Sequence, residues 1–272
     1  MDGPTIDVRR AEAVADYLAC QEAQRRAWGL ADEGYVVPIA TMVGAQHHGG
    51  LVLGAFLPDG EAVGLSFAFL GRVGDRWCLY SQLTGVVPGY QGRGIGARIK
   101  AIQRDYARSI GLDFIAWSYD PLRAGNARFN LHRLGATANR YVEDMYGPRT
   151  DALNRGVPTD RLIVEWPAVP PEPPPASGPG GEPLDLPRLV EGPNEPSTDG
   201  LGPIPDEASV LVEIPSDIGR IRADDPARAE RWRAAVAGAM LGAFAAGYRS
   251  VDVVRDADRA YYVLRREGGR RP

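Results

Sequence analysis

The spacing of apolar positions predicts an antiparallel meander in the first third of the chain. Three runs have the apolar character and the bounding turns of β-strands, and they are residues 51–56, 62–70 and 77–87. Pro58-Asp59-Gly60 is a turn signal between the first two runs, so these form a hairpin that the third run extends. The elements expected before it are a short strand and a helix within residues 5–30, with Val14, Tyr17, Leu18 and Gln21 on one side of the helix, and a second helix over residues 38–46.

A parallel crossover follows the meander. Residues 94–110 predict a helix whose apolar face consists of Ile95, Ile99, Ile102 and Tyr106. The almost wholly apolar run 113–119 predicts a central strand. A strand, a helix and a strand in this order form a parallel pair, and substrates of such units bind at the carboxyl ends of the strands. The remaining elements are a helix over residues 124–134, which Gly135 ends, and strands near 137–146 and 161–166.

The composition changes at residue 167. Thirteen of the 23 prolines lie in residues 167–205, which contain few large apolar side chains. Such a segment buries too little surface to offset its conformational entropy, so we interpret residues 168–205 as a linker or surface loop. Structure resumes with a strand at 209–214, a helix that begins at Asp225-Pro226, and strands near 248–255 and 260–265. This βαββ unit of about 65 residues is small for a domain, so we expect residues 206–272 to dock on the first domain or on a partner subunit.

The predicted fold class is therefore α/β of the α+β kind: a mixed, mostly antiparallel central sheet flanked by helices, with a C-terminal βαββ extension. At 272 residues, with 44% apolar and 24% charged residues, the composition is that of a soluble globular protein. The net charge of −4 argues against nonspecific nucleic-acid binding and permits a cationic substrate. The start of the chain has no signal-peptide pattern and no apolar run is long enough to span a bilayer, so we expect a cytoplasmic protein without a membrane partner.

The sequence predicts no metal site. Cys20 and Cys78 are too few for a disulfide framework or a thiolate metal site, and we expect both to be packed thiols. His47-His48 lack a third ligand in the sequence. They are expected to be exposed loop residues, with a place in the wall of an acceptor site as the alternative.

A glycine-rich turn stands between the third predicted strand and the next helix. Its sequence is Gln91-Gly92-Arg93-Gly94-Ile95-Gly96, and it follows Pro88-Gly89. Glycines at a helix start let main-chain N–H groups approach an anion closely, and the helix dipole adds positive potential there. The turn therefore predicts a phosphate site, above all for a pyrophosphate, with a tight turn that binds nothing as the alternative. It is neither a Rossmann fingerprint, which needs a third glycine at another spacing, nor a P-loop, which needs Gly-Lys-Ser/Thr.

Residues 83–96 resemble the acyl-CoA signature of the GNAT acetyltransferase superfamily. That signature is an apolar strand followed by Q/R-x-x-G-x-G/A at the next helix, and Gln91, Gly94 and Gly96 fill its fixed positions. A second block, residues 126–136, is similar to the helix after the next strand. The resemblance implies a GNAT fold with acetyl-CoA (coenzyme A) as cofactor. It also implies that the strands on the two sides of the turn splay apart and admit pantetheine.

The same resemblance implies a set of cofactor-binding residues. Residues 1–167 become the acyl-CoA-binding domain, in which backbone groups of the strand pair with pantetheine and the turn holds the pyrophosphate. Asn126 matches an asparagine that bonds pantetheine, although capping a helix is its alternative role. The predicted cofactor-binding residues are Thr84, Val86, Gln91, Gly92, Arg93, Gly94, Ile95, Gly96 and Asn126.

Two residues that many members of the superfamily have are missing. The strand over residues 77–87 has no carboxylate where many members have a glutamate base. Leu131 stands where many members have a tyrosine that acts as acid to the leaving thiolate. The candidates for catalytic residues are Asp120, at the end of the central strand, and His132. Their alternatives are a cap on the turn at Pro121 for Asp120 and a surface position for His132.

The resulting prediction is an acetyl-CoA-dependent N-acyltransferase that acts on a small amine by direct attack in a ternary complex. The alternative is an acyl-CoA-binding regulatory or scaffolding module with little or no transferase activity, and a third possibility is transfer to a protein N-terminus or lysine. The acceptor amine, the acyl chain length, the base and acid, the oligomeric state (a homodimer included) and the role of residues 206–272 stay open.

Overall fold

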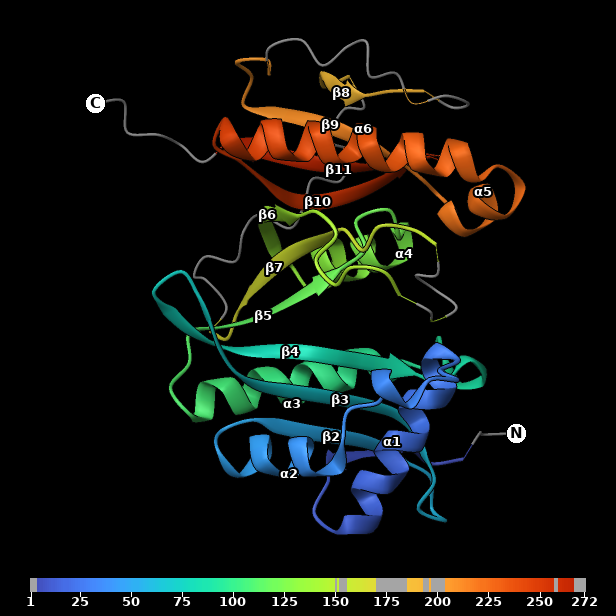
Figure 1. The fold of residues 1–272 in the computed structure, drawn as a ribbon. Helices are drawn as coiled ribbons and strands as arrows, with labels where there is room; N and C mark the ends of the chain where they lie inside the picture. Colours follow the sequence, from blue (N-terminus) through green and yellow to red (C-terminus); the bar gives the residue numbers. More distant parts are fainter. Residues whose placement is uncertain are drawn as a thin grey trace. The chain divides into compact units, whose positions relative to one another are not determined.

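The computed structural model describes residues 4–149, 151, 156–169, 185–192, 196, 204–256 and 259–266 (Figure 1). Its contacts divide the chain into two compact units. The first unit consists of Met1–Trp117, Pro148–Gly156 and Pro167–Val169, and the second of Ser118–Gly147, Val157–Trp166 and Pro170–Pro272. The chain therefore passes from one unit to the other inside the predicted central strand. The division predicted from sequence, with a cofactor domain over residues 1–167 and a docked extension over 206–272, stays a prediction.

The first unit contains the predicted meander and crossover. Its strands are β1 (Asp7–Arg10), β2 (Leu51–Phe56), β3 (Ala62–Val73), β4 (Arg76–Val86) and the first residues of β5 (Phe114–Tyr119). Neighbouring strands lie in this order and pair antiparallel, except that β4 and β5 are parallel. The helices are α1 (Val14–Trp28), α2 (Ile39–His47) and α3 (Ile95–Ser109), with short 3-10 turns η1 (Glu33–Tyr35) and η2 (Pro88–Tyr90). The hairpin, the helix after the glycine-rich turn and the parallel pair are thus confirmed.

The two faces of the first sheet are covered by different helices. Leu65 and Phe67 of β3 pack with residues of α1 and α2 in one apolar core. Ser66, between them, is hydrogen-bonded to Gln103 of α3. Because successive side chains of a strand point to opposite faces, α3 covers the face opposite to α1 and α2. Cys20 and Cys78 are both buried, as predicted, and burial raises the pKa of the Cys20 thiol to about 12.

The predicted faces of two helices are confirmed in part, because Tyr17 on α1 and Ile95 and Ile99 on α3 are buried. On α1, Val14 and Leu18 are 66% and 51% exposed, whereas the buried residues are Tyr17, Cys20, Ala23 and Gln24. On α3, the buried residues are Ile95, Ile99, Lys100, Gln103 and Ala107, while Ile102 and Tyr106 are half-buried. In both helices the buried face is rotated relative to the predicted one, because it includes polar residues that hydrogen-bond inside the unit. A prediction from apolar positions alone overlooks such residues.

The second unit is also a sheet with helices on it. Its strands are β6 (Thr137–Val142), β7 (Arg161–Pro167), β8 (Arg188–Val190), β9 (Ser209–Pro215), β10 (Tyr248–Asp256) and β11 (Arg259–Arg266). They lie in the order β7-β6-β10-β11-β9-β8, antiparallel except for β8 and β9. Its helices are α4 (Ala124–Ala127), a π-helical turn η3 (Arg128–Arg133), α5 (Ile218–Asp224) and α6 (Pro226–Ala245). The mixed, mostly antiparallel fold class is therefore confirmed.

The C-terminal part differs from the predicted βαββ unit in two ways. An additional helix, α5, precedes α6, so the order is strand, helix, helix, strand, strand. Residues 188–190, inside the predicted linker, form β8 beside β9; most of that linker lies outside the described residues. The predicted start of α6 is confirmed, because Asp225 accepts a hydrogen bond from the N–H of Arg228 at 3.0 Å and Pro226 occupies the first turn. No helix in the described ranges is both long enough and apolar enough to cross a bilayer.

A glycine between α2 and β2 provides a test of this packing. A Cβ on Gly50 would lie 2.6 Å from the carbonyl oxygen of Ala68 and 2.7 Å from that of Ala45, and neither main-chain atom can move cheaply. We expect Gly50→Ala to lower the free energy of unfolding by about 2 kcal/mol, as over-packing does. Gly44→Ala, inside α2 with open space around it, should be neutral or stabilising by up to about 1 kcal/mol. Urea denaturation measures both variants, and equal stabilities would contradict the packing described.

Candidate functional site

The glycine-rich turn presents main-chain N–H groups at the start of α3. Gly92 and Gly94 both have φ of 77°, in the left-handed region, and an added Cβ would meet nothing within 4 Å at either position. The first helical hydrogen bond runs from the N–H of Arg98 to the carbonyl of Gly94. The N–H groups of residues 92–97 donate to no main-chain carbonyl in the turns and loops of the described residues. This turn, at the positive end of a 15-residue helix, has the form of an anion-binding nest.

The side chains of the turn leave its amides accessible. Gln91 donates from Nε2 to the carbonyl of Val86 at 3.0 Å, which ties the turn to the end of β4. The guanidinium of Arg93 lies 5.1 Å from the centroid of the Tyr90 ring and donates to the carbonyl of Gly89. Residues 91–94 and Arg98 are exposed. Both arginines therefore stand next to the nest with their charge in solvent.

A β-bulge lies where β4 approaches the turn. The register with β3 shifts between the pairs Phe67–Leu83 and Ala68–Ser81, so Gln82 is an extra residue on β4. Because of this extra residue, Ser81 and Thr84 point to the same face, and their hydroxyl oxygens are 3.3 Å apart. β4 pairs with β5 at two positions, and within the described part of the first unit the β4 residues beyond Tyr80 have no ladder partner on that side. The edge that includes Thr84 and Val86 is thus open to an extended ligand.

A buried polar cluster lies between this strand and α3. Its members are Ser66, Ser81, Thr84, Lys100 and Gln103. Lys100 is 3% exposed, and its Nζ lies 3.1 Å from the Ser81 hydroxyl and 3.7 Å from the centroid of the Trp117 ring. Burial lowers its pKa from 10.5 to about 7, because the charged form loses its hydration. Sequence reasoning missed this residue, although the chain signals it: Lys100 is the only lysine among 31 lysines and arginines.

Asp120, in the second unit, is engaged in an ion pair. It accepts two hydrogen bonds from the guanidinium of Arg233, at 3.2 and 3.3 Å, and one from the N–H of Leu122 at 3.0 Å. The side chain of Arg233 is 10% exposed and also lies 3.8 Å from Asp160. The turn-capping role of Asp120 is therefore confirmed. Its role as a base stays a prediction, which these three donors disfavour because they occupy the oxygens that would take a proton.

His132 lies in the π-helical turn and forms a pair that the sequence did not reveal. Its Nδ1 is 3.0 Å from Oδ1 of Asp252, on β10, and its side chain is 44% exposed. A carboxylate at Nδ1 favours the tautomer with its hydrogen there and leaves the lone pair of Nε2 available. Asp252 is far away in sequence and emerges at a bulge of β10. This pair has the arrangement of an oriented general base.

The remaining candidate residues differ in how exposed they are. Asn126 is exposed within α4 and does not cap it, since Arg123 holds the N-cap position. Leu131, at the position of the missing tyrosine, is buried. Tyr119 is also buried, and its hydroxyl lies 3.1 Å from that of Tyr262. His47 and His48, in the first unit, are exposed as expected. No cluster of three or more His, Cys, Asp or Glu side chains suited to a metal occurs in the described ranges.

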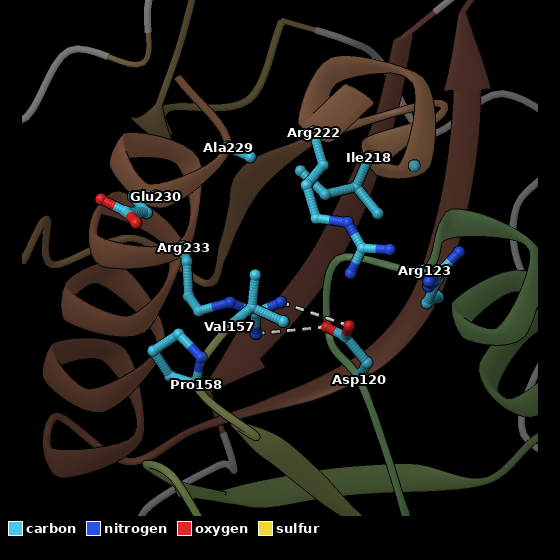
Figure 2. Close-up of a pocket in the computed structure, with 10 residues that line it drawn as sticks. Asp120, Arg123, Val157, Pro158, Ile218, Arg222, Ala229, Glu230 and Arg233 are labelled. Carbon is cyan, nitrogen blue, oxygen red and sulfur yellow. Dashed lines mark hydrogen bonds and ion pairs between the residues drawn. The ribbon is translucent and has the colours of Figure 1, made fainter. Parts of the chain in front are cut away.

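A small pocket of about 20 Å³, partly open to solvent, lies beside the Asp120–Arg233 pair (Figure 2). The residues that line it are Asp120, Arg123, Val157, Pro158, Ile218, Gly219, Arg222, Ala229, Glu230 and Arg233. In Figure 2, Arg222 extends into it from α5, while Glu230 points away from Asp120. The charged lining consists of three guanidinium groups and two carboxylates, of which Arg233 and Asp120 are paired with each other.

The structure thus brings together one part of the predicted site. Thr84, Val86 and the turn over residues 91–96 lie in the first unit, where Gln91 of the turn donates a hydrogen bond to the carbonyl of Val86 on β4. Asp120, Asn126 and His132 belong to the second unit. The residues that sequence reasoning missed are Lys100, Gln103, Asp252 and Arg233.

Comparison with known proteins gives matches only at the level of solved structures. No family model and no curated protein matches the chain. A phosphinothricin acetyltransferase of the GNAT superfamily from Sinorhizobium meliloti, in complex with acetyl-CoA, is 18% identical over 60% of this chain and 88% of its own, with a TM-score of 0.47. The ribosomal-protein-S18-alanine N-acetyltransferase of Escherichia coli is 19% identical over 60% and 94%, with a TM-score of 0.45. An IAA acetyltransferase from Bacillus cereus is 15% identical over 60% and 99%, also with a TM-score of 0.45. At these identities the likeness is one of fold alone.

The depressed pKa of Lys100 predicts a pH-dependent contribution to stability. Between about pH 7 and 10.5 the unfolded chain binds a proton at Lys100 that the folded chain does not, so the free energy of unfolding rises with pH in this window. Lys100→Met removes that contribution. We expect the difference in stability, wild type minus Lys100→Met, to rise by up to about 1.4 kcal/mol per pH unit there. Urea denaturation across this window measures it, and a difference independent of pH would show that Lys100 is solvated.

Proposed function

We propose that this chain is an acyl-CoA-dependent N-acyltransferase that transfers an acetyl group to a small amine by direct attack in a ternary complex. The observation on which the proposal depends is the nest of main-chain N–H groups at the start of α3, with Gly92 and Gly94 in the left-handed region. A diphosphate is the ligand that fits such a nest best, since its oxygens accept several N–H bonds at the positive end of the helix dipole. The resemblance of residues 83–96 to an acyl-CoA signature then identifies the diphosphate as that of coenzyme A.

The open edge of β4 supports the rest of the cofactor site. In the proposed complex, pantetheine extends from the nest along Val86 and Thr84, as an added strand would, and the thioester lies beside Thr84, at the bulge of Gln82. Gln91 holds the two parts of this site together through its bond to Val86. Arg93 and Arg98, which are exposed beside the nest, supply positive charge to the phosphates. The adenosine part of coenzyme A makes no contact with the nest in this arrangement.

The acceptor amine must lose a proton before it can attack, because an alkyl ammonium has a pKa of about 10.4. His132, oriented by Asp252 at 3.0 Å, is the better candidate for this base, and Asp120 is the weaker one because Arg233 holds it. The amine then attacks the thioester carbonyl, and the C–S bond breaks with its electron pair on sulfur. Positioning of the two reactants and proton transfer together supply the acceleration.

Replacing one glycine tests the cofactor site. Gly94→Asp places a carboxylate where the phosphate binds, and we expect it to weaken acetyl-CoA binding by about 100-fold or more, because like charges in contact repel. Gly94→Asn has a similar shape without the charge and should weaken binding at least about 10-fold less. Calorimetry with acetyl-CoA measures both.

The control is Gly74→Asp, a glycine with φ of 59° and open space outside the nest, which should bind like the wild type. Equal affinities of Gly94→Asp and Gly94→Asn would mean that no phosphate meets this turn. Absence of binding by the wild type at millimolar acetyl-CoA would end the proposal.

Turnover separates the enzyme from the alternative, an acyl-CoA-binding module without activity, which the missing glutamate and tyrosine favour. Thiol release from acetyl-CoA is measured with a panel of small amines. We expect turnover with some amine, and a decrease of about 100-fold in kcat for His132→Gln, with Asp252→Asn between that variant and the wild type. Asp120→Asn tests the competing base. Tight acetyl-CoA binding without turnover over the whole panel would favour the module.

A further inference from the structure

Apart from Thr84, the buried cluster around Lys100 has no role in the function proposed so far. An interior lysine is costly, because its charged form loses hydration and its neutral form must be kept deprotonated. Lys100 has no carboxylate partner among the described residues, and the polar atom closest to its amine is the Ser81 hydroxyl at 3.1 Å. Every other basic side chain of the Lys and Arg class in this chain is arginine, which cannot exchange its proton near neutral pH.

The hydrogen bonds of this cluster run, donor to acceptor, from Lys100 through Ser81 toward Thr84. Ser81 accepts from Lys100 and from Nε2 of Gln103, at 3.1 and 2.9 Å. A hydroxyl has two acceptor sites and one hydrogen, so with both sites filled Ser81 must donate, and Thr84 Oγ1 lies 3.3 Å away. The Thr84 hydroxyl in turn donates to the Ser66 hydroxyl, 3.3 Å away. A protonated Lys100 therefore orients the hydrogen of Ser81 away from the amine and toward Thr84, at the half-buried end of the cluster.

That end is the segment of β4 along which the proposed function places pantetheine. Lys100, Ser81, Thr84 and the nest all belong to the first unit. A chain of three polar groups thus connects an interior amine with the strand that holds the thiol end of the cofactor. Leu131 stands where a tyrosine acid would be expected, so the leaving thiolate lacks that source of a proton.

Resting on the proposed function, we propose that Lys100 supplies, through Ser81 and Thr84, the proton that the leaving thiolate of coenzyme A takes up. When the tetrahedral intermediate collapses, the C–S bond breaks and its electron pair stays on sulfur. Thr84 gives its hydroxyl proton to that sulfur, Ser81 gives its own to Thr84, and the Lys100 ammonium gives one to Ser81. Lys100 is left neutral and regains a proton from solvent, after the acceptor amine has released one, so the overall reaction conserves protons.

The acidity of Lys100 suits this step. An ordinary lysine at about 10.4 is a weaker acid than a thiol at about 8.5, so it would not protonate a thiolate readily. Burial lowers the pKa of Lys100 to about 7, which makes the transfer downhill. The groups that face its amine are Ser81 of β4 and the Trp117 ring of β5, with Gln103 beside it on α3 and Ser66 of β3 beyond. None of these ionises near neutral pH, so Lys100 titrates by itself.

The test uses acetyl transfer from acetyl-CoA to hydroxylamine, followed by thiol release. Hydroxylamine is a neutral nucleophile at pH 7, so the step that removes a proton from an ammonium is bypassed and protonation of the thiolate is isolated. We expect Lys100→Met to bind acetyl-CoA within about twofold of the wild type and to lose about 100-fold in kcat. The wild-type rate should fall as pH rises through about 7, and Lys100→Met should lack this decline. Ser81→Ala and Thr84→Val, which keep Lys100 but interrupt the path, should show the same loss.

Two controls separate a proton donor from a structural residue. Ile102→Met, on the same helix and half-buried outside the cluster, should leave kcat unchanged. With the selenium analogue of acetyl-CoA, whose selenolate needs no proton in order to leave, the defect of Lys100→Met should shrink to less than about 10-fold. An equal defect with both donors would overturn the proposal, as would a wild-type kcat in Lys100→Met.

A spectroscopic measurement covers the case in which Lys100→Met does not fold. Because the chain has one lysine, ¹³C-labelled lysine gives one side-chain signal, and its shift against pH reports the pKa of Lys100 directly. A midpoint near 10.5 would overturn the proposal. If the wild type binds acetyl-CoA but does not accelerate the transfer to hydroxylamine, the proposed transferase function fails. If the wild type accelerates this transfer and Lys100→Met has the same kcat, only the proposed proton relay fails.

Discussion

The site depends on the main-chain N–H groups at the start of α3, to which the described part of the chain offers no main-chain acceptor. A helix leaves its first N–H groups unpaired, and in this chain two glycines in the left-handed region turn additional amides toward the same point. The turn leaves these N–H groups accessible, because its residues are exposed and the side chains of Gln91 and Arg93 donate to carbonyls of β4 and η2. A bound diphosphate satisfies these groups collectively. The bulge at Gln82 and the open edge of β4 then determine where the remainder of such a ligand extends.

The opposite constraint holds inside the same unit. The turn uses exposed backbone to attract negative charge, whereas α3 buries a lysine for which the described residues supply no counter-charge. Burial depresses the pKa of Lys100 and makes it, in the proposed mechanism, a source of protons near neutral pH. The Ser81 and Thr84 hydroxyls connect the two features, since Thr84 belongs to both the cluster and the cofactor strand. Burial of Lys100 therefore lowers the stability of the fold and at the same time gives this lysine the acidity that the proposed function needs.

The local parts of this site could be predicted from sequence. Glycine spacing identified the turn, and strand and helix periodicity identified β4, α3 and β5, because both signals are short-range. The buried stripe of α3 was predicted only in part: Ile95 and Ile99 belong to it, but so do Lys100 and Gln103, whose hydrogen-bond partners Ser66 and Ser81 are far away in sequence. The pairing of His132 with Asp252, 120 residues later, has the same cause. Residue type alone also suggested Asp120 as a base, but Arg233, 113 residues later, holds it.

The most direct test of the account is a crystal structure of the chain with coenzyme A. The account predicts the diphosphate within hydrogen-bond distance of the N–H groups between Gly92 and Gly96, and pantetheine along β4 with its thiol beside Thr84, at the bulge. Nucleotide bound at any other place, with these amides bonded to the protein's own atoms or to solvent alone, would contradict it.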